Sequence, residues 1–318
     1  MILAGSAACA VIECRGFLIR MAHLMFDALR LAFYRLAAKG WVPARWFEPD
    51  LPPVAARTAK TGPLDLEIVS HCWNYSHFLA YQLSSLVLFP PTRLNVTMTV
   101  FYAPEDTRTA QLLEFFSTQS VPGVTWNWRA LPRQELFRRG IGRNRAALET
   151  RADWVWFTDC DLMFRDDCLD TLAELLQGRQ DALIFPEEER TTDLLAEDNP
   201  MLTAAHEPAV LDIDTGSFTV KRPSKATGPL QIAHGDVCRA VGYCRHIALY
   251  QQPSEQFAKC HEDRAFRWLV QSQGEPLPIP SVYRIRHISK GRYTGSKANT
   301  GVRTALRRLQ SRLRDGNG

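Results

Sequence analysis

The sequence predicts an α/β protein with a mostly parallel sheet and helices on both faces. Two observations predict it: apolar runs of strand composition alternate with amphipathic segments from Leu64 onward, and the spacing suits repeated strand–helix–strand units. An N-terminal helical extension precedes this region and a basic tail follows it. The chain has 318 residues, of which 46% are hydrophobic and 23% charged, so it can bury a full core without disulfides.

The extension comes first. Residues 16–39 repeat apolar side chains at three- and four-residue spacing with arginines largely between them, and Gly40 is a plausible end of this helix. Such a helix can lie in a membrane interface or pack on the following domain, and both alternatives stay open. Prolines between residues 43 and 53 indicate a linker. The apolar residues 1–12 are too few to span a bilayer and lack a basic start, so we expect neither a signal peptide nor a membrane span.

Strands and helices alternate after the linker. We expect strands over residues 66–70, 95–102, 124–130, 154–158, 182–185, 212–221 and 282–288. We expect helices over residues 77–89, 107–120, 142–149, 168–178 and 262–271. Gly216 lies inside one expected strand and would leave room for a ligand. Ligands of such sheets bind at the carboxyl ends of the strands.

Two aspartates follow the most apolar of these strands. Residues 154–158 are rich in aromatic side chains, Asp159 and Asp161 come next, and apolar residues resume at once. If the strand continues, both carboxylates point to the same side. Paired carboxylates at a strand end suit Mg²⁺ or Mn²⁺, which would keep further positions for a diphosphate. The alternative is that these aspartates only cap a turn.

Charge is unevenly distributed along the chain. The net charge is +4, but the segment from Ser281 to the end holds ten lysines and arginines against one acid. This tail suggests an anionic partner, either a membrane surface or a phosphate. No nucleic-acid-binding motif is present, so we expect no nucleic acid partner. The eight cysteines form no Cys-x-x-Cys pair and are expected to be free thiols in a reducing cytosol.

The motifs together resemble the family 2 glycosyltransferases of GT-A fold, whose sheet is Rossmann-like. The resemblance covers residues 64–288 and rests on elements in the family's order: Cys72-Trp73-Asn74, Ala103-Pro104-Glu105-Asp106, Gly142-Arg143-Asn144-Arg145-Ala146, Asp159-Cys160-Asp161 and His261-Glu262-Asp263. The chain departs from the family where a proline usually precedes the aromatic residue, and where Arg145 and Ala146 replace small residues.

The resemblance implies an inverting, metal-dependent transfer of a sugar from a nucleotide diphosphate sugar, most often a UDP-sugar, to an acceptor hydroxyl. It implies that Asp263, beside Glu262, is the catalytic base. The expected ligands of Mn²⁺ or Mg²⁺ are Asp159, Asp161 and His287. The expected donor-binding residues are Ser70, His71, Trp73, Asn74, Asp106, Arg143, Asn144, Asp159, Gly216, Lys290 and Arg292. For His71 and Trp73, a role in the core is an equal alternative.

These features predict three regions: an extension and linker over residues 1–60, a transferase domain over 61–290, and a basic tail over 291–318. The domain would bind the nucleotide with residues 61–165 and the acceptor with residues 166–290. The acceptor would be a glycan or a lipid-linked molecule at the cytoplasmic face of a membrane. A sugar-phosphate nucleotidyltransferase and a non-catalytic nucleotide-sugar-binding protein are the competing hypotheses.

Overall fold

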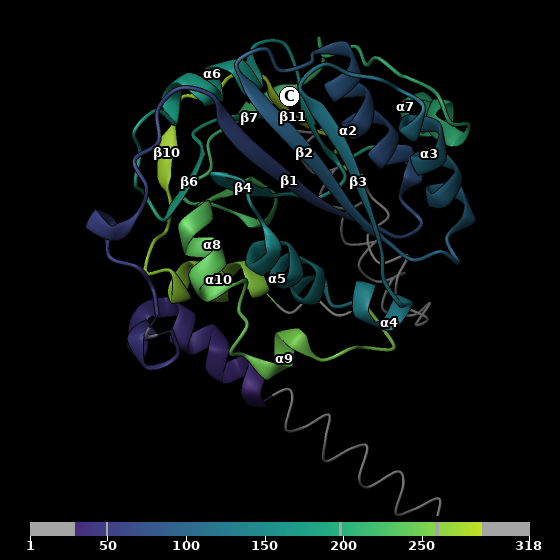
Figure 1. The fold of residues 1–318 in the computed structure, drawn as a ribbon. Helices are drawn as coiled ribbons and strands as arrows, with labels where there is room; N and C mark the ends of the chain where they lie inside the picture. The colour runs from purple at the N-terminus through teal and green to yellow at the C-terminus, as the bar shows by residue number, and fades with distance from the viewer. Residues whose placement is uncertain (1–28, 49, 197–198, 258–260, 288–318) are drawn as a thin grey trace, which may run out of the picture.

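The computed structural model describes residues 29–48, 50–196, 199–257 and 261–287. Its main sheet has seven strands in the order β10-β6-β9-β4-β1-β2-β3 (Figure 1). These strands are β1 (Leu64–Cys72), β2 (Leu94–Tyr102), β3 (Val124–Ala130), β4 (Trp154–Phe157), β6 (Leu183–Pro186), β9 (Gln231–His234) and β10 (Glu275–Leu277). All pairings are parallel except those of β9, which runs antiparallel to β4 and β6. The predicted α/β class with a mostly parallel sheet is confirmed.

Helices cover both faces of the sheet. The longer ones are α2 (Ser76–Leu88), α3 (Thr107–Ser117), α5 (Arg139–Glu149), α6 (Cys168–Leu175), α8 (Gly235–Val241) and α10 (Glu262–Leu269); short ones are α4 (Arg133–Leu136), α7 (Pro200–Thr203) and α9 (Ala248–Gln251). Figure 1 shows α2 and α3 on one side of the sheet and α5, α8 and α10 on the other. The last two residues of β1 point to opposite faces of the sheet. Cys72 contacts Thr109 of α3, whereas His71 lies against Gly142 of α5.

A second sheet of four short strands has the order β5-β11-β7-β8. Its members are β5 (Leu162–Phe164), β7 (Glu189–Thr191), β8 (Thr219–Lys221) and β11 (Val282–Arg284). The predicted strand over residues 212–221 is wrong except for β8. Gly216 lies in a turn instead, where its N–H donates to Asp214 Oδ1 at 2.9 Å. An aspartate that accepts a bond from the backbone two residues on favours such a turn over an extended strand.

The register of the central strands places the candidate site. Val69 of β1 pairs with Phe157, the last residue of β4, and the N–H of Thr158 donates to the carbonyl of Val69 at 2.9 Å. The chain therefore leaves β4 beside the end of β1. Both strands are almost entirely buried, as expected for parallel strands covered on both faces, and β4 is wholly apolar.

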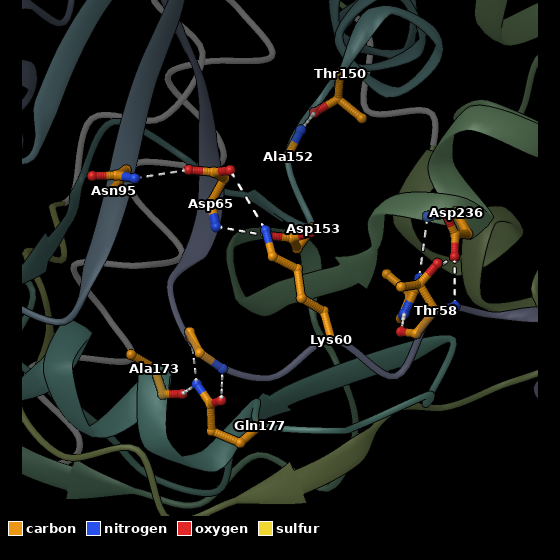
Figure 2. Close-up of polar contacts among 12 residues, drawn as sticks. Thr58, Lys60, Asp65, Asn95, Thr150, Ala152, Asp153, Ala173, Gln177 and Asp236 are labelled. Carbon is orange, nitrogen blue, oxygen red and sulfur yellow. Dashed lines mark hydrogen bonds and ion pairs between the residues drawn. The ribbon is translucent and has the colours of Figure 1, made fainter.

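The linker is fixed to the opposite edge of the sheet. Asp153, just before β4, accepts from Lys60 at 2.6 Å and from the N–H of Asp65 at 2.8 Å, while Thr58 donates its N–H to Asp236 at 2.7 Å (Figure 2). Gln177 closes the same edge through the backbone of Gly62. The segment that connects the extension to the domain is thus held on the domain by hydrogen bonds and an ion pair.

Residues 29–36 are helical, and a π-turn over Ala37–Trp41 ends the helix at Gly40, whose φ of +91° suits glycine. The predicted stop at Gly40 is confirmed. The described part of the chain contains no helix that is long and apolar enough to cross a membrane. Five cysteines of the described residues are free and buried: Cys72, Cys160, Cys168, Cys238 and Cys244. The basic tail from residue 288 onward lies outside the described residues.

Candidate active site

The two aspartates lie in a turn between β4 and β5. The N–H of Leu162 donates to the carbonyl of Asp159 at 3.2 Å, and Gln82 of α2 donates to the carbonyls of Asp159 and Leu162 at 3.0 and 2.9 Å. The N–H of Ile285 donates to the carbonyl of Asp161 at 3.0 Å. The strand therefore does not continue through the two aspartates, as the predicted common side of their carboxylates had required, and their shared side stays a prediction. Hydrogen bonds to the backbone carbonyls of the turn, two of them donated by the buried side-chain amide of Gln82, hold the turn in place.

Two arginines of α5 converge on the first aspartate. Arg139 and Arg143, one helical turn apart, place guanidinium nitrogens 2.5 and 3.3 Å from Asp159 Oδ1. Arg143 is 1% exposed and also donates to the carbonyl of Thr158 at 3.2 Å. Arg139 in turn lies 3.5 Å from Glu262 Oε1. Charge-assisted bonds of this kind are stronger than neutral ones, so the four side chains form one charged cluster at the carboxyl ends of β1 and β4.

A buried network joins this cluster to the start of α10. Arg143 donates to the hydroxyl of Tyr243 at 3.0 Å, and that hydroxyl donates to Gln231 Oε1 at 2.7 Å. The amide of Gln231 donates to the backbone carbonyl of Asp263 at 3.0 Å. All three side chains of this network are fully or almost fully buried, so the network fixes Arg143 relative to Asp263.

The two acids of α10 face different partners. Glu262 is 8% exposed and pairs with Arg139, whereas Asp263 pairs with Arg267 at 3.3 Å, one turn along the same helix. Adjacent helical residues point about 100° apart, which accounts for the division. The backbone of Gly228 lies beside Asp263, at 3.8 Å from a Cβ built on that glycine to the Cβ of Asp263. Asp263 thus packs next to the backbone of a glycine.

His71 brings an unsatisfied ring to the same region. It stacks on Phe101 with ring centroids 5.0 Å apart, and neither ring nitrogen has a hydrogen-bond partner among the described residues. Burial, with Arg143 and Arg139 nearby, holds the pKa of His71 well below its usual range, so the ring is neutral. A buried polar group without a partner costs about 1–3 kcal/mol, so a bound ligand or water that reaches the ring would recover that cost.

The loop after β1 is held by Asp106. The N–H of Asn74, a residue with φ of +56°, donates to Asp106 Oδ2 at 2.6 Å, and the hydroxyl of Thr109 donates to the same oxygen at 2.6 Å. Asp106 is therefore the buried N-cap of α3 and the anchor of the loop. Trp73, half-buried, packs edge-on against Phe137 with ring centroids 5.4 Å apart. These contacts give Asp106 and Trp73 structural roles, and their predicted roles in binding the donor stay predictions.

The other predicted donor residues make different contacts or lie outside the described residues. Asn144 accepts the N–H of Tyr243 at 2.9 Å and packs against Gly242, so it joins α5 to the end of α8. Ser70 is fully buried within β1. Gly216 lies in the exposed turn described above, beside the second sheet. Lys290 and Arg292 lie outside the described residues.

The predicted metal ligands come only partly together. His287 is buried and packs against Phe78 and Tyr75, with ring centroids 4.4 and 5.3 Å away. It follows Ile285, which binds the backbone of Asp161, so the late segment does run beside the aspartate turn. Among the described residues, however, the three ligand atoms of Asp159, Asp161 and His287 do not gather within 4.8 Å of one another. The predicted three-ligand cage is not formed.

Two carboxylates on one short turn still provide the hard oxygen ligands that Mg²⁺ and Mn²⁺ prefer. The residues therefore fit a cation held by the aspartates and completed by substrate oxygens or water. In the described part of the chain, ligand atoms do lie within 4.8 Å of one another in a different group of three residues: Glu48, Asp50 and His246.

Sequence reasoning missed several residues that build the site: Gln82, Arg139, Gly228, Gln231 and Tyr243. Only Arg139 carried a usable signal, since it precedes Arg143 by one helical turn and would share its face. The others act through contacts between residues far apart in the chain, which no local pattern shows.

Neither a protein-family model nor a curated protein sequence matches the chain. Among solved structures, it is similar to the mannosyltransferase PcManGT from Pyrobaculum calidifontis in complex with GDP-Man and Mn²⁺, with 14% identity and a TM-score of 0.41 over 95% of this chain and 76% of that one. It is also similar to S. aureus TarS 1-349 in complex with UDP-GlcNAc, with 11% identity and a TM-score of 0.41 over 77% of this chain and 66% of that one. For the same TarS segment in complex with UDP, the shares are 70% and 60%. At this level of similarity the likeness decides neither substrate nor mechanism.

Proposed function

We propose that the chain is a GT-A-type glycosyltransferase that moves a sugar from a nucleotide diphosphate sugar to an acceptor hydroxyl with inversion. One observation supports this best: Asp159, Arg139, Arg143 and Glu262 form a single charged cluster at the carboxyl ends of two parallel strands. Such an edge is where ligands of α/β sheets bind. Transfer from a diphosphate requires positive charge at the leaving group, and the cluster carries two guanidinium groups there.

Asp159 and Asp161 would hold Mn²⁺ or Mg²⁺. When bound, the cation would neutralise charge that develops on the departing diphosphate. Arg143 is fixed by Tyr243 and cannot move far, so it would orient the donor. Arg139 is more exposed and is held by two acids, so it would exchange Asp159 for a diphosphate oxygen when the donor enters.

Asp263 would take the proton of the acceptor hydroxyl at a carboxylate oxygen. Its carboxylate pairs with Arg267 and lies beside the backbone of Gly228. Glu262 would instead position Arg139. A hydroxyl activated in this way attacks opposite the leaving group, which inverts the anomeric centre.

The test is a panel of nucleotide sugars with Mn²⁺ or Mg²⁺, scored by thermal shift and by release of the nucleoside diphosphate. We expect one donor class to stabilise the protein in a metal-dependent manner. Asp263→Asn should lower transfer at least about a hundredfold, the usual scale for general-base catalysis, and leave donor binding unchanged. Glu262→Gln should weaken donor binding as well, because it frees Arg139.

Glu149→Gln is the matched control. Glu149 is an exposed acid of α5 that pairs with Arg129, far along the helix from Arg139. Transfer by Asp263→Asn at the wild-type rate would refute the assignment of the base. A protein that binds no nucleotide sugar with either metal would refute the function itself.

The location proposed for this reaction is the cytoplasmic face of a membrane, where a glycan or lipid-linked acceptor would be available. The basic segment after Ser281 supports contact with an anionic surface.

A further inference from the structure

Large apolar side chains are concentrated on the outside of the N-terminal extension. Five of the nine large hydrophobic residues that the described chain exposes lie within residues 29–46, and we call these five the tryptophan surface: Leu29, Phe33, Leu36, Trp41 and Trp46. Trp41 is 80% exposed and Trp46 is 70% exposed. Single exposed apolar residues are ordinary on a protein surface, whereas large apolar side chains gathered in one short segment point to an interaction site.

The helix of residues 29–36 has two apolar sides. Leu29, Phe33 and Leu36 follow four- and three-residue spacing, so they share one side, and all three are exposed. On the other side, Leu31 and Tyr34 pack on the core. The sequence alternatives of docking on the domain and facing a membrane therefore apply to different sides of one helix.

The inner side is firmly attached. Tyr34 lies against Tyr250 with ring centroids 6.1 Å apart, and Phe47 lies against Trp268 at 5.1 Å. The indole N–H of Trp268 donates to the carbonyl of Val42 at 2.8 Å. Figure 1 shows this segment at the edge of the molecule, next to α10 and α9. The tryptophan surface is thus presented on a fixed support.

The same segment is purely cationic. Arg30, Arg35, Lys39 and Arg45 lie within residues 29–47, and that stretch holds no acid. Arg35, Lys39 and Arg45 are exposed. Aromatic residues of this kind favour the headgroup level of a bilayer, and each lysine or arginine near an anionic surface contributes about 1 kcal/mol.

We propose that the tryptophan surface docks the protein on a bilayer that contains anionic lipid. A second copy of the chain suits the surface poorly, because an isologous contact would oppose the same cations. This inference deepens the membrane location in the proposed function, but it depends on a surface that does not include the charged cluster of the active site.

The experiment measures co-sedimentation of the full chain with vesicles of phosphatidylcholine alone or mixed with phosphatidylglycerol. The double variant Trp41→Ala/Trp46→Ala should bind mixed vesicles at least about tenfold more weakly, since it removes two of the largest apolar contacts. The variant Arg35→Gln/Lys39→Gln should lose roughly thirtyfold in affinity for mixed vesicles and almost none for neutral ones.

Leu88→Ala/Val220→Ala is the matched control, because it removes two exposed apolar side chains elsewhere and should bind as wild type does. Vesicle binding that is unchanged in Trp41→Ala/Trp46→Ala would overturn the proposal. Self-association in analytical ultracentrifugation that this variant abolishes, without vesicle binding by wild type, would assign the surface to a second copy and also overturn it. Donor hydrolysis in solution should be equal in all these variants, which separates failure of this proposal from failure of the proposed function.

Discussion

Glu48 is a buried acid whose ionisation should limit the stability of the extension. Its side chain is 0% exposed, and neither carboxylate oxygen has a hydrogen-bond partner in the described structure. The imidazole of His246 lies 3.6 Å away and is 46% exposed. Burial raises the pKa of Glu48 to about 7 despite the opposing effect of Arg245.

The magnitude and sign follow from linkage. The pKa is raised from an unfolded value of 4.5, so Glu48 favours the folded state fully below that value, and the contribution is lost as pH rises towards 7. The loss approaches about 3 kcal/mol above pH 7. Glu48→Gln removes the titration while it keeps the side-chain shape. We therefore expect the variant to gain stability relative to wild type by about 1 kcal/mol near pH 5 and by about 3 kcal/mol near pH 8.

The assay is urea unfolding of both proteins at several pH values, with EDTA present so that no metal occupies the Glu48, Asp50 and His246 trio. Differences between variant and wild type cancel the titration of all other groups to first order. Glu105→Gln, at an exposed acid, is the control and should show no such trend. A difference between Glu48→Gln and wild type that stays constant from pH 5 to pH 8 would refute the reasoning.

Two further changes test the support of the site. A Cβ added by Gly142→Ala would lie 2.2 Å from His71 Nε2, so it should cost about 1–3 kcal/mol in urea unfolding, and less in a His71→Ala background; equal costs in both would contradict the contact. Gln82→Met removes the donor to the two carbonyls of the Asp159 turn, so we expect about 2–4 kcal/mol of destabilisation and weaker Mn²⁺ affinity by titration calorimetry, and unaltered affinity would show that the turn does not depend on Gln82.

The regular parts of the fold were predictable because their pattern is local. The strand over Val124–Ala130 begins and ends where apolar and polar residues alternate, and the helix of residues 107–117 begins one residue after a capping aspartate. The strands Gln231–His234 and Glu275–Leu277 were not predicted. They are only three or four residues long, too short for an alternating pattern to stand out in the sequence. They form because neighbouring strands supply their hydrogen-bond partners.

The sequence predicted which acidic residues lie in the candidate site better than it predicted how they are arranged. Asp159, Glu262 and Arg143 belong to one cluster, and the spacing of Arg139, one helical turn before Arg143, was a signal that the prediction did not use. The sequence could not decide between Glu262 and Asp263. Helical geometry predicts that the two side chains point in different directions, but it does not predict which one faces the aspartate turn. That depends on the rotation of α10, which the packing of Phe266 and Trp268 sets.

The chain of bonds from Arg143 through Tyr243 and Gln231 to Asp263 has an evolutionary consequence. Replacing only one of the side chains of Arg143, Tyr243 and Gln231 would leave a buried polar atom without its hydrogen-bond partner. Substitutions at these positions should therefore show strong epistasis, and a homologue that lacks the tyrosine should have rebuilt the whole connection. Changes of donor preference would then tend to arrive together with changes near the acceptor.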